Sequence, residues 1–546
     1  MITLARWRLQ VQGAASVLAR WRLQVQGAVS VLARWRLRVQ GAASGLARGW
    51  LRVQGAASGL ARWLLHLQPT ISTVVRRSLR AQVAMITVAR HSLRAQGGDA
   101  HIGAAGPSLA LRMSGGRTCC AQPRPIWTRA MLLRGIRMQN YRAFVGEVNV
   151  SLRPLTLLFG YNSAGKSALL RALPLIAESI YSKKGPLAAG GGSARGGNFR
   201  DIRTRWSPVG RLRFGLDWAD GDTSLDVELA DLASTQRQVI ETFRLRDAVR
   251  GELLFELDIA DERAADITTY TCAGERGRIL FDGWIPAQIE GFTGGDAAKR
   301  LQDAGSALKR VADAVHWISA LRAQPRRNVP LIGSKDSIAE DGAGTFESLA
   351  RESLAPRSDV LQDVSAWFQR ATKHTLTVRQ QAAGDAPLFH VELVPLRAPH
   401  GIHLADTGEG MAQVLPVITL GALATVGRLG EAPILAIENP EMHLHPRAHA
   451  DVADYLVAVA KHATVVVETH SENFMLAVQL AIARGQIDAK DVIVHWVSST
   501  EEGPSFVKTI TFDEKARPSA WPPDVFAEDR ELARKLIAQR HGFSSS

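Results

Sequence analysis

The sequence predicts an α/β fold whose core sheet is assembled from two distant segments of the chain. A glycine-rich loop lies between a short apolar strand, "LTLLF", and an apolar helix within residues 154–173. Two more apolar strands, at 433–438 and 463–468, each end in a glutamate. The runs between these segments alternate apolar and polar residues, which is typical of antiparallel strands. We therefore expect a core that is split by a long insertion.

The charge of the chain is unevenly distributed. The 546 residues include 46% hydrophobic and 22% charged residues, and the formal net charge is +14. Residues 1–130 contain 19 Arg, no Lys and one acidic residue, Asp99, so their net charge is +18. The other 416 residues carry 47 basic and 51 acidic residues, a net charge of −4. The overall charge therefore does not make the rest of the chain a nucleic-acid binder.

The cysteines and the apolar runs indicate a cytoplasmic protein with no membrane segment. The cysteines are Cys119, Cys120 and Cys272, and their spacing fits neither a disulfide framework nor a zinc site. A reducing compartment is consistent with this usage. The longest apolar stretch, 414–427, is too short and too interrupted to span a bilayer.

Residues 1–130 contain a repeat of 14 residues in seven copies, beginning with "ARWRLQVQGAASVL" at Ala5. Solenoid repeats start at about 20 residues, and no copy carries a helix cap or a turn signal, so we expect an irregular conformation. A basic arm that binds phosphate and a transit peptide are two interpretations. Translated repeat DNA upstream of a true start at Met131 is the interpretation that the near-identical copies favour. We exclude 1–130 from the fold prediction.

The loop after the first strand has the Walker A pattern, Gly160-x-x-x-x-Gly165-Lys166-Ser167, in its required strand–loop–helix context. Glycines let backbone N–H groups turn toward phosphate oxygens, and the helix start adds partial positive charge. Lys166 is expected to reach the β- and γ-phosphates of ATP, and Ser167 to ligate Mg²⁺. The predicted nucleotide-binding residues of this loop are Gly160, Asn162, Ser163, Ala164, Gly165, Lys166, Ser167 and Ala168.

The chain divides into a first lobe at 131–184, an insertion at 185–400, a second lobe at 401–500 and a tail at 501–546. Within the insertion, alternation predicts strands at 211–218, 224–229, 253–259 and 388–396, and helical spacing predicts a helix over 296–322. Arg322, Arg326 and Arg327 lie close together in the sequence. They are either a phosphate or nucleic-acid contact or a solvated basic turn.

The second lobe is predicted to complete the site. Thr407, Gly408, Glu409 and Gly410 precede an apolar helix, where small residues and a hydroxyl suit an anion. Glu438 ends a buried strand and is expected to hold Mg²⁺, usually through water. Pro446 suits the first turn of the next helix. The following strand leads to a helix that is expected to begin near Ser471 and to stop at Gly485.

Three histidines lie in the turns of this lobe: His443, His445 and His470. A metal site is one interpretation, but no cysteine accompanies them and no third and fourth ligands are defined. Hydrogen bonding in the turns is the interpretation that we favour. His470 follows a strand end, where open α/β sheets bind ligands, and is placed to sense a γ-phosphate.

Taken together, "NYRAF", "GYNSAGKS", "TGEGMAQVLP", "IENPEMHLHP", "VVVETHSENF" and "WPPDVFAED" resemble the ABC-type AAA ATPases related to RecF, SMC and overcoming-lysogenization-defect proteins. The resemblance covers about 131–546 and is narrower with a bacterial subgroup that carries a C-terminal domain of unknown function. It implies two split lobes with an arm-like insertion and ATP held at a head-to-tail dimer interface. It also implies that residues 407–410 are the signature segment facing the partner's ATP, and that His470 is the switch histidine. It assigns no glutamine loop.

Two departures from this family matter. No TOPRIM nuclease pattern follows Asn473, so the chain is not expected to cut nucleic acid by itself. Asn439 stands where many relatives carry the glutamate that activates water, and loss of a general base costs about 10²–10⁴-fold in rate. Pro440 is expected to hold Asn439 extended, so that Glu441 projects beside it and accepts the proton. Alternatively, Glu441 only caps the following turn.

The predicted function is a slow Mg²⁺-dependent ATPase that forms a homodimer around ATP and acts on DNA or on a partner protein. By analogy with the related proteins, the resemblance suggests a role in genome maintenance or phage defence. The alternative is an ATP-gated sensor with negligible turnover that regulates a partner nuclease or toxin. The insertion between the lobes argues against a transporter ATPase.

Overall fold

The computed structural model divides into two compact units, 1–120 and 121–546. In the first it describes four short strands, and in the second residues 132–521, 531 and 534–537. The gaps within 132–521 are 220–222, 233–236, 248–252, 260–268, 273, 293–294, 332–337, 384–385, 399 and 501–502. Much of the predicted tail, including most of "WPPDVFAED", and both Cys119 and Cys120 lie outside the described residues.

The repeat unit contains strands where the sequence prediction expected irregular chain. These are β1 (Ala5–Gln12), β2 (Arg20–Gln26), β3 (Ala33–Gln40) and β4 (Arg48–Gln54). β1 pairs in parallel with β3, and β2 pairs in parallel with β4. Each pair joins two alternate copies of the repeat, and equivalent positions of the two copies lie opposite each other. The prediction overlooked that Trp7, Leu9 and Val11 alternate with polar residues, which is the period of a strand.

A six-stranded sheet forms the core of the second unit, in the order β15-β20-β21-β7-β22-β23. The strands are β7 (Leu155–Gly160), β15 (Val315–Ile318), β20 (Ile434–Glu438), β21 (Thr464–Glu468), β22 (Val492–Ser499) and β23 (Ser505–Ile510). All neighbours are parallel except β22 and β23. β7, from the first lobe, lies between two strands of the second lobe. The predicted α/β class and the split core are therefore confirmed.

The inserted strands belong to a nine-stranded antiparallel sheet, in the order β14-β13-β12-β11-β10-β9-β8-β5-β6. Its strands are β5 (Leu133–Gln139), β6 (Val148–Ser151), β8 (Arg211–Trp218), β9 (Thr223–Leu232), β10 (Arg237–Asp247), β11 (Leu253–Ile259), β12 (Thr269–Cys272), β13 (Glu275–Asp282) and β14 (Ile285–Glu290). β8 pairs directly with β5, so these strands extend a sheet that begins in the first lobe. The strands predicted at 211–218, 224–229 and 253–259 are confirmed as β8, β9 and β11.

The helix predicted over 296–322 is too long. Helix α4 spans Gly295–Ala314, and the chain then becomes β15, which pairs in parallel with β20. Leu301, Leu308 and Val311 are buried as their helical spacing predicted. Val315 and Ile318 continued that spacing, but pairing with a core strand overrides the local pattern.

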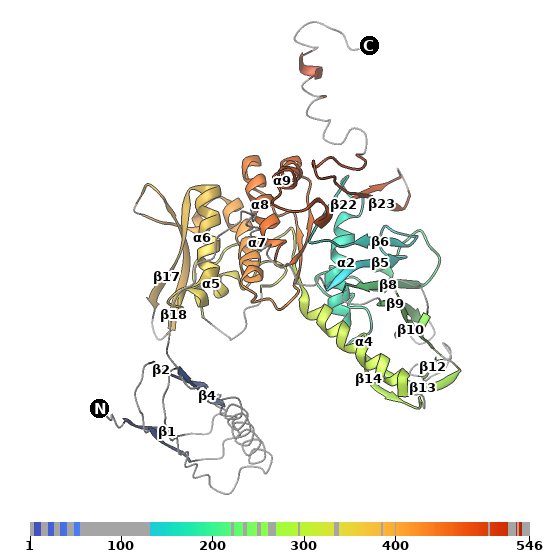
Figure 1. Ribbon diagram of the computed structural model, residues 1–546, viewed down its shortest axis with the longest axis horizontal. Helices are drawn as coiled ribbons and strands as arrows, with labels where there is room; N and C mark the ends of the chain where they lie inside the picture. The colour runs from blue at the N-terminus through green and yellow to red at the C-terminus, as the bar shows by residue number, and fades with distance from the viewer. Residues whose placement is uncertain are drawn as a thin grey trace, which may run out of the picture. The chain divides into compact units, whose positions relative to one another are not determined.

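Helices cover both faces of the core sheet (Figure 1). Helix α2 (Lys166–Ile180) packs between it and the nine-stranded sheet, in one hydrophobic cluster with Ile434 and Ala436 of β20. Leu435 and Ile437 point to the other face, into a second cluster. That face carries α6 (Asp359–Thr372), α7 (Glu409–Thr425), α8 (Pro446–Val459) and α9 (Glu472–Ala483). The strand ends between these layers are therefore held from both sides.

A small sheet pairs β16 (Val329–Pro330) with β18 (Ala386–Pro395), and β18 with β17 (His374–Ala383) and β19 (Ile402–His403). The strand predicted at 388–396 is therefore confirmed as β18. Other helices among the described residues are α3 (Phe199–Ile202), α5 (Thr345–Ser353), η1 (Leu404–Asp406) and η2 (Ala489–Asp491). The predicted helix boundaries in the second lobe are also confirmed, because Pro446 begins α8 and Ser471 caps α9.

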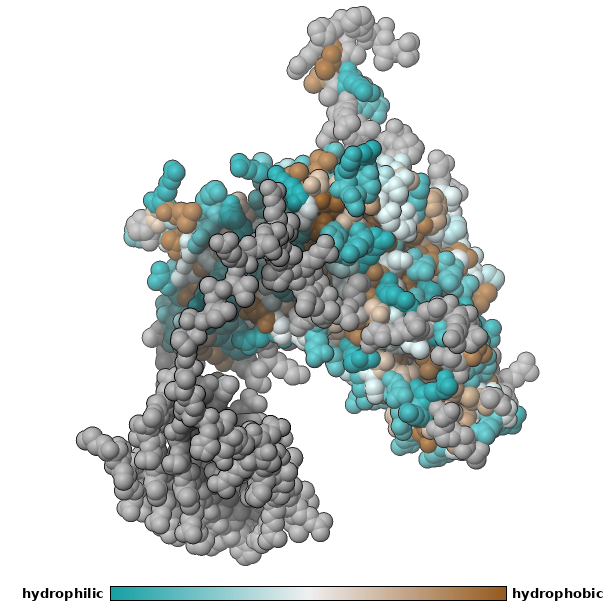
Figure 2. Space-filling model, viewed as in Figure 1, coloured by the Kyte–Doolittle hydropathy of each residue, from teal (hydrophilic) through white to brown (hydrophobic). Residues whose placement is uncertain are grey.

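The surface shows no single large apolar area among the described residues on the face in view (Figure 2). Hydrophilic and hydrophobic residues are interspersed on it. The exposed large hydrophobic residues lie on several separate elements, and include Tyr161, Leu321, Leu396, Leu476 and Phe506. Isolated exposed apolar residues are normal on a folded protein. The polar edge of the core sheet is therefore the more informative feature.

Candidate functional site

The phosphate loop connects β7 to α2, as the sequence predicts. Three of its residues have a left-handed backbone: Gly160 (φ 144°), Ser163 (φ 61°) and Gly165 (φ 103°). A Cβ at position 160 would lie 1.9 Å from the carbonyl oxygen of Val497, and one at 165 would lie 3.0 Å from the Phe144 ring. Both glycines are therefore needed for the backbone conformation and for close packing against β22 and Phe144.

The amino end of α2 is open toward the loop. Gly165 is its N-cap, and it supplies no side-chain hydrogen bond to the first turn. The first turn also contains no acidic residue. Ala164 is buried, Ala168 is half-buried, and Asn162 and Ser163 are exposed. The helix therefore presents uncapped N–H groups and a partial positive charge, which suit a phosphate.

Lys166 folds back over the loop. Its ammonium donates hydrogen bonds to the carbonyl oxygens of Gly160 (3.0 Å) and Tyr161 (2.6 Å), and the residue is only 3% exposed. Burial lowers the pKa of Lys166, and the nearby charge of Glu468 opposes that shift. The loop thus holds a desolvated cation at the start of α2. The low local dielectric there strengthens the attraction of this cation to an anion.

The acidic strand ends meet at the same edge of the sheet. Glu438 and Glu468 are aligned partners on the neighbouring strands β20 and β21. β21 lies directly beside β7, and Glu468 is aligned with Leu158. The hydroxyl of Ser167 donates a 2.7 Å hydrogen bond to Oε1 of Glu468. The phosphate loop and the acidic edge, far apart in sequence, therefore form one site.

Glu438 accepts hydrogen bonds on both carboxylate oxygens. Arg171 of α2 donates to Oε1 from Nε (2.5 Å) and to Oε2 from Nη2 (2.6 Å). The Trp317 indole (3.1 Å) and the backbone N–H of Ala320 (3.2 Å) are further donors to this carboxylate. The carboxylate predicted to hold Mg²⁺ is thus 1% exposed and engaged by the protein. Among the hydrogen bonds of the described residues, Ser167 is linked to Glu468 and not to Glu438.

Asn439 does not have the conformation that the sequence predicted. Its φ is 40°, in the left-handed region, and its N–H donates to the carbonyl oxygen of Glu468 at 2.8 Å. The expectation that Pro440 holds it extended beside Glu441 is therefore wrong. Asparagine tolerates this region better than most residues because its side chain is short and polar. Its Oδ1 is buried and accepts no hydrogen bond from the described residues.

Glu441 connects the turns that follow β20 and β21. Its Oε1 accepts hydrogen bonds from the Thr469 hydroxyl (2.6 Å) and the His470 N–H (3.2 Å). Its Oε2 is buried and has no hydrogen-bond partner among the described residues. One carboxylate oxygen therefore holds the His470 turn, a contact that neither interpretation of Glu441 predicted, and the other oxygen receives no hydrogen bond from the described residues.

His470 lies on the exposed side of the same turn. Its pKa is lowered, first by partial burial and then by the charge of Lys166. The imidazole is therefore neutral at pH 7 and close enough to Lys166 to respond to it electrostatically. The described residues contain no group of three or more His, Cys, Asp or Glu side chains that could hold a metal ion.

The basic residues after β15 have separate roles. Arg322 is buried, and it donates from Nη2 to the carbonyl oxygen of Glu438 (2.6 Å) and from Nη1 to that of Gln413 (3.0 Å). Burial lowers its pKa to about 10. Arg327 is exposed and paired with Asp406, and Arg326 is exposed. Arg322 fits neither predicted interpretation. It supports the loop after β20, a role that the sequence did not indicate.

The segment 407–410 lies against that loop. The Thr407 hydroxyl donates to the carbonyl oxygen of Leu404 (2.7 Å), and Gly408 caps α7. A Cβ at Gly410 would lie 2.4 Å from the carbonyl oxygen of His443. Gly410 therefore permits close contact, while Gly408 and Glu409 stay exposed at the amino end of α7.

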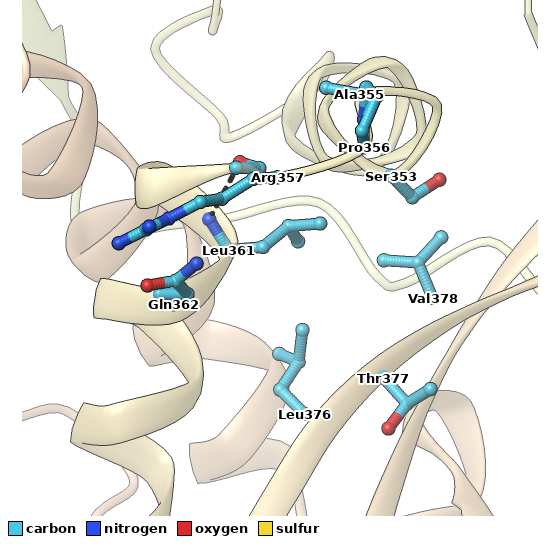
Figure 3. Close-up of a pocket in the computed structure, with 10 residues that line it drawn as sticks. Ser353, Ala355, Pro356, Arg357, Leu361, Gln362, Leu376, Thr377 and Val378 are labelled. Atoms are coloured by element: carbon cyan, nitrogen blue, oxygen red, sulfur yellow. Dashed lines mark hydrogen bonds between the residues drawn. The ribbon is translucent and has the colours of Figure 1, made fainter.

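A cavity of about 340 Å³ lies apart from these residues, between the α5–α6 turn and β17 (Figure 3). Its lining includes Ser353, Arg357, Leu361, Gln362 and Thr377. None of the residues that line it belongs to the phosphate loop or to the acidic edge. Among the described helices, none has the length and apolar character of a membrane span.

The sequence profile of the family described as "AAA ATPase domain" matches residues 351–475. This segment contains 407–410, Glu438, Asn439, Glu441 and His470, but it begins after the phosphate loop. No curated protein matches the chain.

Three solved structures show a distant similarity. The first, a SmcHead bound to the C-winged helix domain of ScpA, has 12% identity and a TM-score of 0.39, and covers 71% of this chain and 100% of its own. An Smc head domain from Pyrococcus furiosus has 10% identity, a TM-score of 0.36, and coverages of 75% and 99%. An SMC head domain from Thermotoga maritima has 12% identity, a TM-score of 0.32, and coverages of 69% and 98%.

Proposed function

We propose that this chain binds ATP with Mg²⁺ at the phosphate loop and hydrolyses it slowly. The hydrogen bond between Ser167 and Glu468 carries this proposal, because it joins residues 301 positions apart in the sequence. It brings the amide-lined loop, the Lys166 ammonium and the acidic strand edge to one place. That combination of groups binds and activates the phosphates of a nucleotide in P-loop proteins. The match of residues 351–475 to an ATPase domain supports the same function.

The residues at the site fit both the phosphates of ATP and the Mg²⁺ ion. The uncapped amino end of α2 and the loop N–H groups suit phosphate oxygens, with Lys166 beside them. The Ser167 hydroxyl and the carboxylates are hard oxygen donors, which Mg²⁺ prefers, and the ion needs only one or two protein ligands. When bound, Mg²⁺ supplies Lewis-acid neutralisation of the phosphate charge.

The turns after β20 and β21 are proposed to handle the attacking water. The free Oε2 of Glu441 accepts its proton, while Oε1 stays bonded to Thr469 and His470. His470, neutral at pH 7, donates toward the γ-phosphate. Because one carboxylate would serve two tasks, the turnover is proposed to be slow.

The exposed segment at the amino end of α7 is proposed to face the ATP of a second copy. Gly408 and Glu409 are exposed there, so a second copy can reach them. Two copies arranged head to tail would then enclose the nucleotides. Closure of this dimer is proposed to act on DNA or on a partner protein in genome maintenance or phage defence.

Turnover by the full chain tests the enzymatic function. With ATP and Mg²⁺ we expect slow phosphate release that Lys166→Ala abolishes. Lys515→Ala, at an exposed lysine outside the site, is the matched control and is expected to keep the wild-type rate. A wild-type chain that binds no ATP would overturn the proposal.

An ATP-gated sensor is the second candidate function, and Asn439 favours it. An amide cannot take a proton from water, and Glu441 is already engaged through one oxygen. The sensor would regulate a partner nuclease or toxin by occupancy alone. A wild-type chain that binds ATP and dimerises, but releases no phosphate, would establish the sensor function instead.

A further inference from the structure

Among the described residues, the carboxylate that contacts the phosphate-loop serine is that of Glu468 and not that of Glu438. Glu468 ends the strand next to β7, and its Oε1 accepts the hydrogen bond from the Ser167 hydroxyl at 2.7 Å. Ser167 is the residue of the loop whose hydroxyl suits a magnesium ion. A carboxylate in contact with that hydroxyl is therefore beside the expected metal position.

The second oxygen of Glu468 has no partner. Oε2 is buried and accepts no hydrogen bond from the described residues, although the side chain is only 3% exposed. A buried carboxylate oxygen without a donor is costly, and a cation is one of the few groups that relieves the cost.

Glu438 shows the opposite condition. Its two oxygens accept four hydrogen bonds, two of them from Arg171 and the others from Trp317 and Ala320. The Trp317 indole and the Ala320 N–H belong to β15 and the residues that follow it, beside β20 in the sheet. To free this carboxylate for a metal, both the end of β15 and the side chain of Arg171 would have to move.

We infer that Glu468, together with Ser167, is the acidic residue that orients the divalent cation, and that Glu438 is a structural carboxylate locked by Arg171. The inference rests on the proposed nucleotide function and specifies which carboxylate serves it. Two aligned glutamates thereby divide two tasks. The one nearer β7 faces the ligand, and the one farther away fixes α2 against β20 and β15.

Metal affinity, measured apart from turnover, distinguishes the two glutamates. The probe is Mn²⁺ followed by electron paramagnetic resonance, with the full chain and a non-hydrolysable ATP analogue. Nucleotide affinity in EDTA is measured in parallel. We expect Glu468→Gln to weaken Mn²⁺ binding by about 10- to 100-fold, because loss of a metal-orienting group typically costs that much. Nucleotide affinity in EDTA stays near the wild-type value, and the exposed Glu514→Gln control changes neither quantity.

The Glu438→Gln variant is expected to melt at a lower temperature while keeping wild-type Mn²⁺ affinity. If it loses Mn²⁺ affinity while Glu468→Gln retains it, the assignment is overturned. Glu468→Asp, which keeps the charge on a shorter side chain, decides the question if Glu468→Gln does not fold. It is expected to show an intermediate loss, and full Mn²⁺ affinity would contradict the inference.

Failure of the underlying function has a different signature. A wild-type chain that binds no nucleotide overturns the proposed function and this assignment with it. A wild-type chain that binds Mn²⁺ with the ATP analogue, and is unaffected by Glu468→Gln, overturns the assignment alone.

Discussion

Arg171 and Glu438 form a bidentate ion pair in the interior, with Nε–Oε1 and Nη2–Oε2 distances of 2.5 and 2.6 Å. The pair joins the helix after the phosphate loop to the acidic end of β20. Arg171 also lies over the Trp317 ring, with its guanidinium carbon 5.5 Å from the ring centroid. The position of α2, and hence of the phosphate loop, therefore depends on a contact between the two halves of the split core.

Arg171→Met is expected to destabilise the protein strongly. Removing one partner of a buried ion pair leaves the other charge uncompensated, which costs about 3–5 kcal/mol. Urea unfolding with a probe of the second unit measures the change. Arg327→Met removes an arginine from an exposed pair with Asp406 and is the control, for which little change is expected. Equal effects of the two substitutions would contradict the structural role of Arg171.

Gly160→Ala is expected to disrupt the phosphate loop. The residue has φ 144°, and an added Cβ would lie 1.9 Å from the Val497 carbonyl oxygen. Backbone strain of this kind costs about 1–3 kcal/mol, and displacement of β22 adds to it. Thermal unfolding should show a lower midpoint, with weakened ATP binding. Gly190→Ala meets no atom within 4 Å and should leave both unchanged.

Glu441→Gln is expected to separate proton transfer from binding. The amide keeps an oxygen for Thr469 and His470 but cannot accept a proton, so turnover should fall by about 10²–10⁴-fold. ATP affinity, measured by calorimetry, should stay near the wild-type value. Thr469→Val removes the hydroxyl donor to Glu441 and tests the positioning role. Unchanged turnover in Glu441→Gln would exclude Glu441 as the base.

Stability is expected to fall as the pH drops below about 6.5, the ordinary pKa of histidine. Burial lowers the pKa of His316 and of His495, so the folded state keeps both neutral where the unfolded chain binds protons. The stability they contribute is present above the unfolded pKa and is lost toward the folded pKa. The Nε2–H of His495 donates to the carbonyl oxygen of Ser151 (2.8 Å), and in the neutral ring Nδ1 accepts from the Thr509 hydroxyl (3.2 Å).

The pH dependence can be assigned with one variant. His495→Gln removes the titrating group, so the slope of unfolding free energy against pH between 7 and 5 should decrease. The reduction is at most about 1.4 kcal/mol per pH unit, the value for one proton. A slope identical to that of wild type would show that His495 does not titrate in this range.

The sequence by itself determined the phosphate loop, the apolar strands around it and several strands of the insertion. The glycines at 160 and 165, the apolar strands and the caps at Pro446 and Ser471 act through local geometry, which depends on neighbouring residues alone. Alternation likewise located β8, β9 and β11. These local signals were sufficient to predict a split α/β core with a phosphate loop.

Only the tertiary structure decided which side chains meet at the strand ends. The helical spacing of 301–318 extends to Ile318, but residues 315–318 form β15 because pairing with β20 outweighs the local pattern. Asn439 adopted a left-handed backbone, although the proline after it predicted an extended one. Glu438 and Glu468 end similar strands, and their different partners follow from sheet order, since β21 and not β20 lies beside β7. Strand order depends on long-range pairing, which residue spacing within one segment does not encode.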